Sequence, residues 1–154
     1  MPKSSAGILL YRFRNGAPEI FLVHPGGPFW ANKDDGAWSI PKGEPLPGED
    51  LLAAAKREFH EETGQSIDGI FRALAPVRQA SGKIVHAWAV EGDCDAGAIT
   101  SNTFMMEWPP RSGRTQAVAE VDRAEWFDFT AARRKINAGQ IALIGQVMRL
   151  LTLE

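Results

Sequence analysis

The clearest structural signal in the chain is the segment GEPLPGEDLLAAAKREFHEETG, residues 43–64. Its second part, Glu49–Thr63, predicts a helix, because it is rich in Ala and Leu, opens with acidic residues and is followed by Gly64. The preceding residues 41–48 contain three prolines and predict a loop. The segment is therefore expected to be a loop that leads directly into a helix.

Three glutamates share one face of this helix. Glu58, Glu61 and Glu62 stand at positions i, i+3 and i+4, which puts their Cβ atoms about 5–6 Å apart. Their face lies beside the apolar stripe, so the acids flank the side that packs against the rest of the protein. We expect Arg57 to neutralise one of them at most and a divalent cation to relieve the remaining repulsion. Clustered carboxylates select a hard ion such as Mg²⁺ or Mn²⁺.

A run of charges on a helix is more often a solvated face than a metal site. The longer pattern favours the metal site: Gly43, five residues, Glu49, seven residues, and then REFHEETG at 57–64. A chance match to so many fixed positions is on the order of one in a million at ordinary residue frequencies. These are the residues of the Nudix box, and the chain resembles a Nudix hydrolase.

The resemblance implies a single Nudix domain over residues 1–154, of the α/β (α+β) class, with a mixed β-sheet sandwiched between helices. The order of the predicted elements agrees with it. Apolar runs predict strands at residues 5–12, 18–24, 38–40, 70–77, 84–90, 103–108 and 125–128. Helices are predicted at residues 130–136, capped by Thr130, and from about residue 140.

The resemblance also implies roles for the residues of the box. In the family, the glutamates that match Glu58, Glu61 and Glu62 bind the metal, and the carbonyl that matches Gly43 often joins them. The residue matching Glu49 pairs with the one matching Arg57 and so fixes the loop against the helix, and Gly64 ends the helix. One departure from the family pattern is Gln65, which stands where an aliphatic residue is usual; Ile67 is expected to fill that place.

The implied reaction is hydrolysis of a nucleoside diphosphate linked to another moiety. Metal ions neutralise the pyrophosphate oxygens and acidify a bound water, and a carboxylate then takes the proton of that water. Glu61 is the first candidate for this base, with Glu58 and Arg57 beside it in the catalytic group. The cofactor is expected to be Mg²⁺ or Mn²⁺.

A second match lies outside the box. Glu120 precedes Trp126 by six residues, and Lys42 stands in Pro-Lys-Gly where Pro-Gly-Gly is commoner. Both features resemble the dinucleoside polyphosphate hydrolase branch, which implies that Glu120 is a metal ligand or the base. The alternative is that Glu120 is an exposed loop acid. Rival substrates are nucleoside triphosphates of the nucleotide pool, diphosphoinositol polyphosphates and 5′-pyrophosphorylated RNA, and the rival class is a non-catalytic nucleotide-binding Nudix module.

Five further residues are candidates for binding the substrate. Lys42, Arg111 and Arg114 suit polyphosphate oxygens, although a surface arginine is as often an ordinary solvated base. Phe29 and Trp30 stand in a loop rich in Gly and Pro and suit base stacking, although core packing is the commoner fate of an aromatic ring.

Composition excludes several other classes. The hydrophobic fraction of 44% and the charged fraction of 23% are those of a globular protein. No apolar run approaches the roughly 18 residues of a membrane helix, and a net charge of -2 disfavours general nucleic-acid binding. Cys94 is the only cysteine, so an internal disulfide is impossible and a reducing cytoplasm fits. The expected partner is a small nucleotide; the sequence leaves the oligomeric state open.

Overall fold

The computed structural model describes residues 3–153 of the chain. The strands are β1 (Ser4–Arg14), β2 (Ala17–Pro25), β3 (Lys42–Gly43), β4 (Arg72–Ala73), β5 (Val77–Arg78), β6 (Ile84–Glu91), β7 (Thr103–Glu107), β8 (Thr115–Ala119) and β9 (Val121–Asp128). The helices are α1 (Leu51–Thr63), α2 (Phe129–Lys135) and α3 (Ile141–Leu153), with 3-10 turns at Ala96–Ala98 and Ala138–Gln140. None of the helices in this part of the chain is long and apolar enough to cross a membrane.

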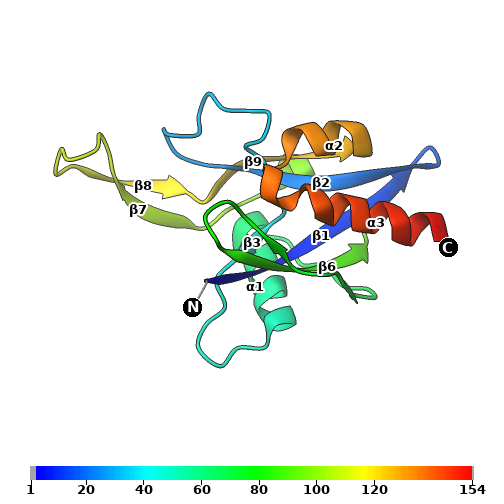
Figure 1. The fold of residues 1–154 in the computed structure, drawn as a ribbon. Coiled ribbons are helices and arrows are strands. Elements are labelled where there is room, and N and C mark those ends of the chain that lie inside the picture. The colour runs from blue at the N-terminus through cyan, green and yellow to red at the C-terminus, as the bar shows by residue number, and fades with distance from the viewer. Residues whose placement is uncertain (1–2, 154) are drawn as a thin grey trace.

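The main sheet is mixed, as expected. Its strands follow the order β4-β6-β1-β2-β9, and β1 lies parallel to β6 but antiparallel to β2 (Figure 1). The short β3 pairs with the start of β1, with Gly43 opposite Ala6. This pairing fixes the loop before α1 to the centre of the sheet, so the first residue of the box is placed by long-range contacts.

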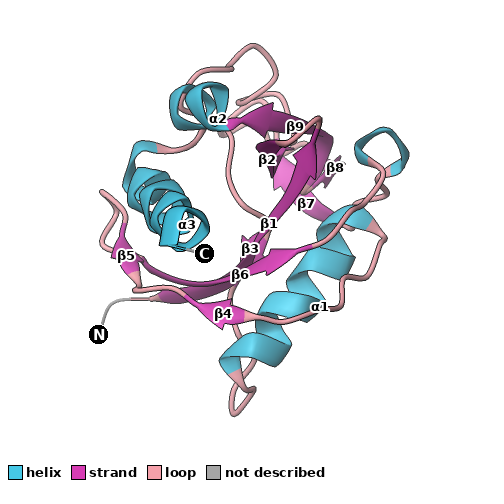
Figure 2. Ribbon diagram, turned by 90° about the vertical axis from the view of Figure 1, so that its right-hand side faces the viewer, coloured by secondary structure: helices cyan, strands magenta, loops and turns pink. Residues whose placement is uncertain are grey.

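Helices cover both faces of the sheet (Figure 2). Along β1, Ile8 and Leu10 pack with Phe59 of α1 on one face, whereas Leu9 and Tyr11 pack with α2 and α3 on the other. Successive strand residues point to opposite faces, so a strand that is apolar throughout must be covered on both sides. The predicted α+β fold, a mixed sheet between helices, is thereby confirmed.

Several predicted boundaries were wrong. The segment 70–77 is extended only over Arg72–Ala73 and at Val77, and residues 38–40 form isolated bridges in place of a strand. The last strand of the main sheet begins at Val121 rather than at residue 125. The helix α2 is capped by Asp128, whose carboxylate accepts from the Ala131 N–H, and not by Thr130.

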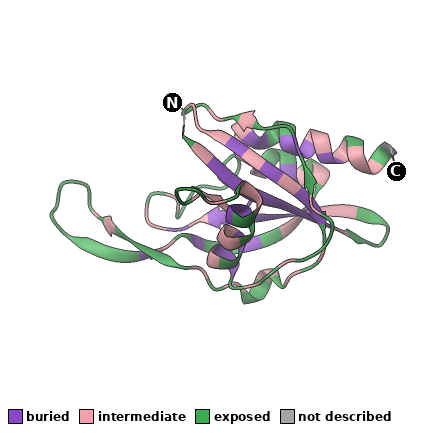
Figure 3. Ribbon diagram, turned by 90° about the horizontal axis from the view of Figure 1, so that it is seen from below, coloured by how far each residue is buried: buried purple, intermediate pink, exposed green. Residues whose placement is uncertain are grey.

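The predicted strand at 103–108 has a partner that the sequence did not reveal. It pairs with β8, and the two form a separate hairpin that projects from the body of the protein (Figures 1 and 3). Residues 109–114 form its irregular tip. Most hairpin residues are exposed, but Val118 is buried at the end nearest the sheet. The hairpin therefore rises directly beside Glu120.

Candidate active site

Residues next to the box helix α1 cap both of its ends. The Asp50 carboxylate accepts from the Ala53 N–H at 3.0 Å, and Gly64 ends the helix in the left-handed conformation with φ 74°. A side chain at Gly64 would be strained at this φ, so glycine suits the position. The predicted helix is confirmed, although its first residue is Leu51 and Glu49 belongs to the preceding loop.

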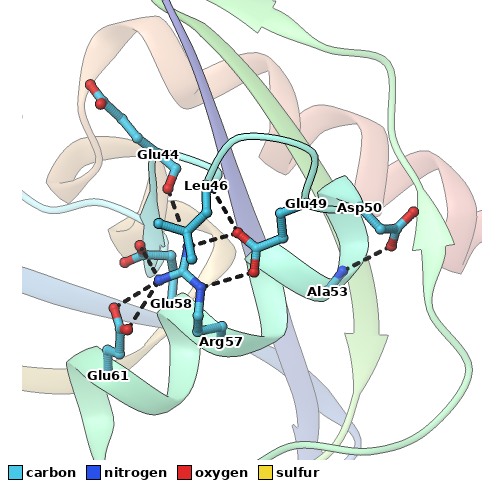
Figure 4. A network of polar contacts seen from close by, with 8 residues as sticks. All are labelled: Glu44, Leu46, Glu49, Asp50, Ala53, Arg57, Glu58 and Glu61. Atoms are coloured by element: carbon cyan, nitrogen blue, oxygen red, sulfur yellow. Dashed lines mark hydrogen bonds and ion pairs between the residues drawn. The ribbon is translucent and has the colours of Figure 1, made fainter.

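Arg57 joins the loop to the helix (Figure 4). Its Nε and Nη2 donate to the two carboxylate oxygens of Glu49, each at 2.9 Å, and Nη2 also donates to the Glu44 carbonyl at 3.2 Å. Glu49 in turn accepts from the Leu46 N–H at 2.9 Å. This paired contact has the geometry in which a planar guanidinium binds a carboxylate most strongly.

Arg57 contacts more carboxylates than expected, although its single positive charge balances only one of them. On the side away from Glu49, its Nη1 donates to Glu58 at 2.9 Å and to Glu61 at 3.0 Å (Figure 4). A guanidinium has five N–H donors, so one arginine can serve three carboxylates. Arg57 therefore sets the positions of two candidate metal ligands as well as that of the loop.

Gly43 lies directly against the carboxylate of Glu58. A Cβ atom built on Gly43 would overlap with all three atoms of that carboxylate group. The absence of a side chain at Gly43 thus allows the Glu58 carboxylate to lie against the loop backbone. The contact places the backbone of the first box residue beside the first box glutamate.

Four carboxyl groups influence one another's charge at this end of α1. Burial raises the pKa of Glu62 well above its ordinary value, and the charges of Glu58 and Glu120 raise it further. Burial and the charge of Glu61 likewise raise the pKa of both Glu58 and Glu120. Acids that are buried beside other acids favour a bound cation, which stabilises their ionised forms.

A cavity of about 170 Å³ opens beside these acids. It is lined by Val23, Pro25, Ser39, Ile40, Lys42, Glu62, Glu120 and Val121. Three of the predicted site residues, Lys42, Glu62 and Glu120, thus come together from three separate segments of the chain. Burial lowers the pKa of Lys42, and the charge of Lys83 lowers it further. The apolar part of the lining was not predicted, because the sequence does not say which strands lie next to one another.

The donor set fits a hard divalent cation, since it consists of carboxylate and backbone oxygens. Among residues 3–153, however, no three His, Cys, Asp or Glu side chains already form a metal-binding group. Glu58 and Glu61 point toward Arg57 (Figure 4). Glu58 and Glu61 could hold a cation at this end of the helix only in side-chain conformations that differ from the present ones.

The remaining candidates lie further out. Arg111 and Arg114 stand at the exposed tip of the β7–β8 hairpin and do not line the cavity. Phe29 is exposed, its ring centroid lies 5.0 Å from that of Trp30, and the Lys33 ammonium lies 3.6 Å from the Phe29 centroid. The contacts of these residues with a substrate stay predictions.

Ile67, Gln65 and Cys94 lie outside the acidic group, and Ile67 packs as the sequence suggested. Ile67 packs in the core beside α1, while the Gln65 amide pairs with both the backbone N–H and the carbonyl of Asp95, at 2.9 Å and 2.8 Å. The unusual glutamine is thus accommodated at the surface by hydrogen bonds. Burial and the charge of Asp93 raise the pKa of the Cys94 thiol to about 12, which agrees with an unreactive cysteine.

The contact between Glu49 and Arg57 predicts a specific dependence of stability on pH. Hydrogen bonds from Arg57 and from the Leu46 N–H lower the pKa of Glu49 from 4.5 to about 2. The stabilisation that it provides is thus present above pH 4.5 and is lost as pH falls toward 2. We expect Glu49→Gln to melt below the unmodified protein at pH 7 and this gap to narrow below pH 4.5. The exposed Glu125→Gln serves as the control, and a gap that does not narrow in acid would contradict the assignment.

Fold and box residues together are those of a hydrolase of the Nudix type. The model of the NUDIX domain matches residues 1–144, so the chain belongs to the Nudix family. A search among curated proteins gives no match.

Solved structures show the same fold. A binary complex of the Caenorhabditis elegans Ap4A hydrolase has a TM-score of 0.67 and 23% identity, with 99% of each chain covered. The NUDIX domain of Shewanella oneidensis NrtR, complexed with ADP ribose, has a TM-score of 0.67 and 16% identity over 98% of this chain and 89% of that one. A mutT/nudix family protein from Listeria innocua has a TM-score of 0.64 and 18% identity over 99% and 96%.

Proposed function

We propose that the protein is a divalent-metal-dependent hydrolase that cleaves a pyrophosphate bond in a nucleoside diphosphate linked to another moiety, and that its substrate is a dinucleoside polyphosphate. The observation that carries this proposal is the cavity in which Lys42, Glu62 and Glu120 meet at the end of the box helix. A cation and an ammonium beside the same cavity suit a ligand with several phosphate groups.

The residues that would hold Mg²⁺ or Mn²⁺ are Glu58, Glu61, Glu62 and Glu120, together with the Gly43 carbonyl. The bound metal supplies charge neutralisation of the pyrophosphate oxygens and a more acidic water. Arg57 orients Glu58 and Glu61, and Lys42, which lines the same cavity as Glu62 and Glu120, would bind phosphate oxygens of the substrate. Glu61 and Glu120 are the two candidates for accepting the proton from water.

The likeness to the C. elegans Ap4A hydrolase and the Lys42–Gly43 pair support the dinucleoside substrate. Phe29 and Trp30 would stack against a base, and Arg111 and Arg114 would reach only the distant end of a long ligand. We place the enzyme in the cytoplasm, because a single partly buried cysteine suits a reducing compartment.

A substrate panel tests this proposal. The protein is incubated with Mg²⁺ and, separately, with dinucleoside polyphosphates, nucleoside triphosphates, ADP ribose and a diphosphoinositol polyphosphate, and the products are identified by phosphorus NMR. We expect the largest kcat/KM with a dinucleoside polyphosphate. Turnover of another member alone would overturn the substrate but keep the hydrolase, whereas nucleotide binding without any turnover would favour a non-catalytic module.

Metal binding has a signature that does not depend on substrate. Because the acids repel one another in the folded protein, Mg²⁺ or Mn²⁺ should bind the folded state preferentially and raise Tm. Ligand at one hundred times its Kd stabilises a protein by about 2.7 kcal/mol. The check is a melting curve with and without each ion, with Ca²⁺-free NaCl of equal ionic strength as the control. A Tm that responds to neither ion would contradict the proposed metal site.

A further inference from the structure

A buried histidine outside the box connects two parts of the candidate site. His24, near the end of β2, is fully buried, and its ring packs against that of Trp38 with centroids 5.1 Å apart. Its Nδ1 lies 2.8 Å from an Asp122 carboxylate oxygen, and its Nε2 lies 2.6 Å from the Lys33 carbonyl oxygen. Both ring nitrogens therefore contact groups that come from other segments of the chain.

Both of these partners are hydrogen-bond acceptors. A carboxylate and a backbone carbonyl have no proton to donate, whereas a neutral imidazole has one N–H donor and one acceptor nitrogen. The two contacts are both hydrogen bonds when each ring nitrogen of His24 carries a proton. Each ring nitrogen thus lies within hydrogen-bonding distance of an acceptor, the carboxylate of the exposed Asp122 on one side and the Lys33 carbonyl on the other.

The Asp122 contact bears on the position of Glu120. In the pairing of β2 with β9, His24 stands opposite Arg123 and Pro25 opposite Val121, so Asp122 is the extra residue of a β-bulge. The bulge puts Val121 and Ala124 on the same buried face. A bulge redirects the residues beside it and is frequent next to active sites. By holding the extra residue, His24 fixes the course of the chain immediately after Glu120.

The Lys33 contact bears on the aromatic loop. The Lys33 N–H donates to the Trp30 carbonyl at 2.9 Å, and the Lys33 ammonium lies over the ring of Phe29. The loop is also tied near Lys33 by Asp34, which accepts from Trp38 Nε1 at 2.8 Å and from Lys135 Nζ at 2.6 Å. His24 therefore fixes the turn that presents Phe29 and Trp30.

We propose that His24 is a positioning residue that sets Glu120 through Asp122 and the aromatic loop through the Lys33 carbonyl, so that one side chain aligns the reacting end and the base-binding part of the site. This inference rests on the proposed function, in which Glu120 acts in the chemical step and Phe29 and Trp30 bind a base. Loss of the contact at Nδ1 should therefore affect the chemical step through Glu120, whereas loss of the contact at Nε2 should affect substrate binding through the aromatic loop.

Two amide variants separate the two contacts. The amide nitrogen of Asn can occupy the place of Nδ1, and that of Gln the place of Nε2. His24→Gln keeps the Lys33 contact and releases Asp122, so we expect kcat to fall about 10- to 100-fold, as for a small misplacement of a catalytic group, with KM nearly unchanged. His24→Asn keeps the Asp122 contact and releases Lys33, so we expect KM to rise about tenfold, the effect of one lost contact with the substrate, with kcat nearly unchanged.

Leu143→Ala provides the matched control, since Leu143 is fully buried on α3 and lines none of the cavity. It should lower Tm while leaving both kcat and KM of the folded protein as they are. If the two His24 variants change kcat and KM by equal factors, or behave like Leu143→Ala, the histidine is merely structural and the proposal is overturned.

A measurement without substrate distinguishes this inference from the proposed function. The Glu120 N–H donates to the Asn102 carbonyl, and the Lys33 N–H donates to that of Trp30. By hydrogen exchange, His24→Gln should speed exchange at Glu120 alone, and His24→Asn at Lys33 alone. This outcome would support the positioning role even if no substrate in the panel were turned over. If each variant changed the exchange rates of the Glu120 and Lys33 amides equally, the positioning role would be overturned even if the enzyme were active.

Discussion

Replacing Glu58 or Glu61 by Gln is expected to lower kcat by about 10² to 10⁴-fold, the range for loss of a group that positions a metal or transfers a proton. The amide keeps the size of the side chain but removes the negative charge that would bind Mg²⁺ or accept a proton. The measurement is steady-state hydrolysis of a dinucleoside polyphosphate at saturating Mg²⁺. Each variant is also titrated with Mn²⁺ while Tm is measured. A variant that has lost a metal ligand should show a smaller rise in Tm, whereas a variant that has lost only the base should show the same rise as the unmodified protein.

The folded state should tolerate these substitutions. Burial and the charge of Glu61 raise the pKa of Glu58, so its ionised form is disfavoured, and a neutral amide relieves that penalty. We therefore expect Glu58→Gln to melt no lower than the unmodified protein in the absence of metal. Glu125→Gln, exposed on β9, is the control and should retain full activity. Hydrolysis that survives in both Glu58→Gln and Glu61→Gln would come from another site.

The box helix could be predicted because its signals are local. Asp50 and Gly64 cap its ends, and the spacing of Glu58, Glu61 and Glu62 fixes their common face whatever the rest of the chain does. The buried β1 could also be predicted, since an apolar run beside an Asn-Gly turn suggests a strand in a hairpin.

The rest of the site depends on contacts between distant segments. The cavity needs Lys42, which β3 brings to the sheet by pairing with β1, and Glu120, which the bulge of β9 places. Neither feature has a sequence signature: β3 has two residues within a proline-rich loop, and the bulge is one extra residue of β9 that depends on how β9 pairs with β2. The pairing of Glu49 with Arg57 was expected from the family resemblance. The further contacts of Arg57 with Glu58 and Glu61 were not predicted, because helical spacing does not say which way these side chains turn.

We expect Gly43→Ala to lower activity strongly while it changes Tm only slightly. This difference should be clearer than for any substitution of the glutamates. The added methyl group would overlap with the Glu58 carboxylate, which is the end of a flexible side chain and can turn away at little cost. Folding should therefore survive, while Glu58 leaves both Arg57 and the candidate metal position. We expect kcat/KM to fall about 100-fold, as for a displaced catalytic group, with a change in Tm of only a few degrees.

The same chemical change at Gly145 is the matched control for this prediction. Gly145 lies within α3, where a Cβ would meet only the end of Arg149 at 3.8 Å. Gly145→Ala should stabilise the protein by about 0.5–1 kcal/mol, because glycine is a poor helix former, and should leave hydrolysis unchanged. If Gly43→Ala kept full activity, hydrolysis would not depend on the present position of Glu58 against the loop backbone. If Gly43→Ala unfolded the protein while Gly145→Ala did not, the close approach of Gly43 to Glu58 would serve the fold and not the site.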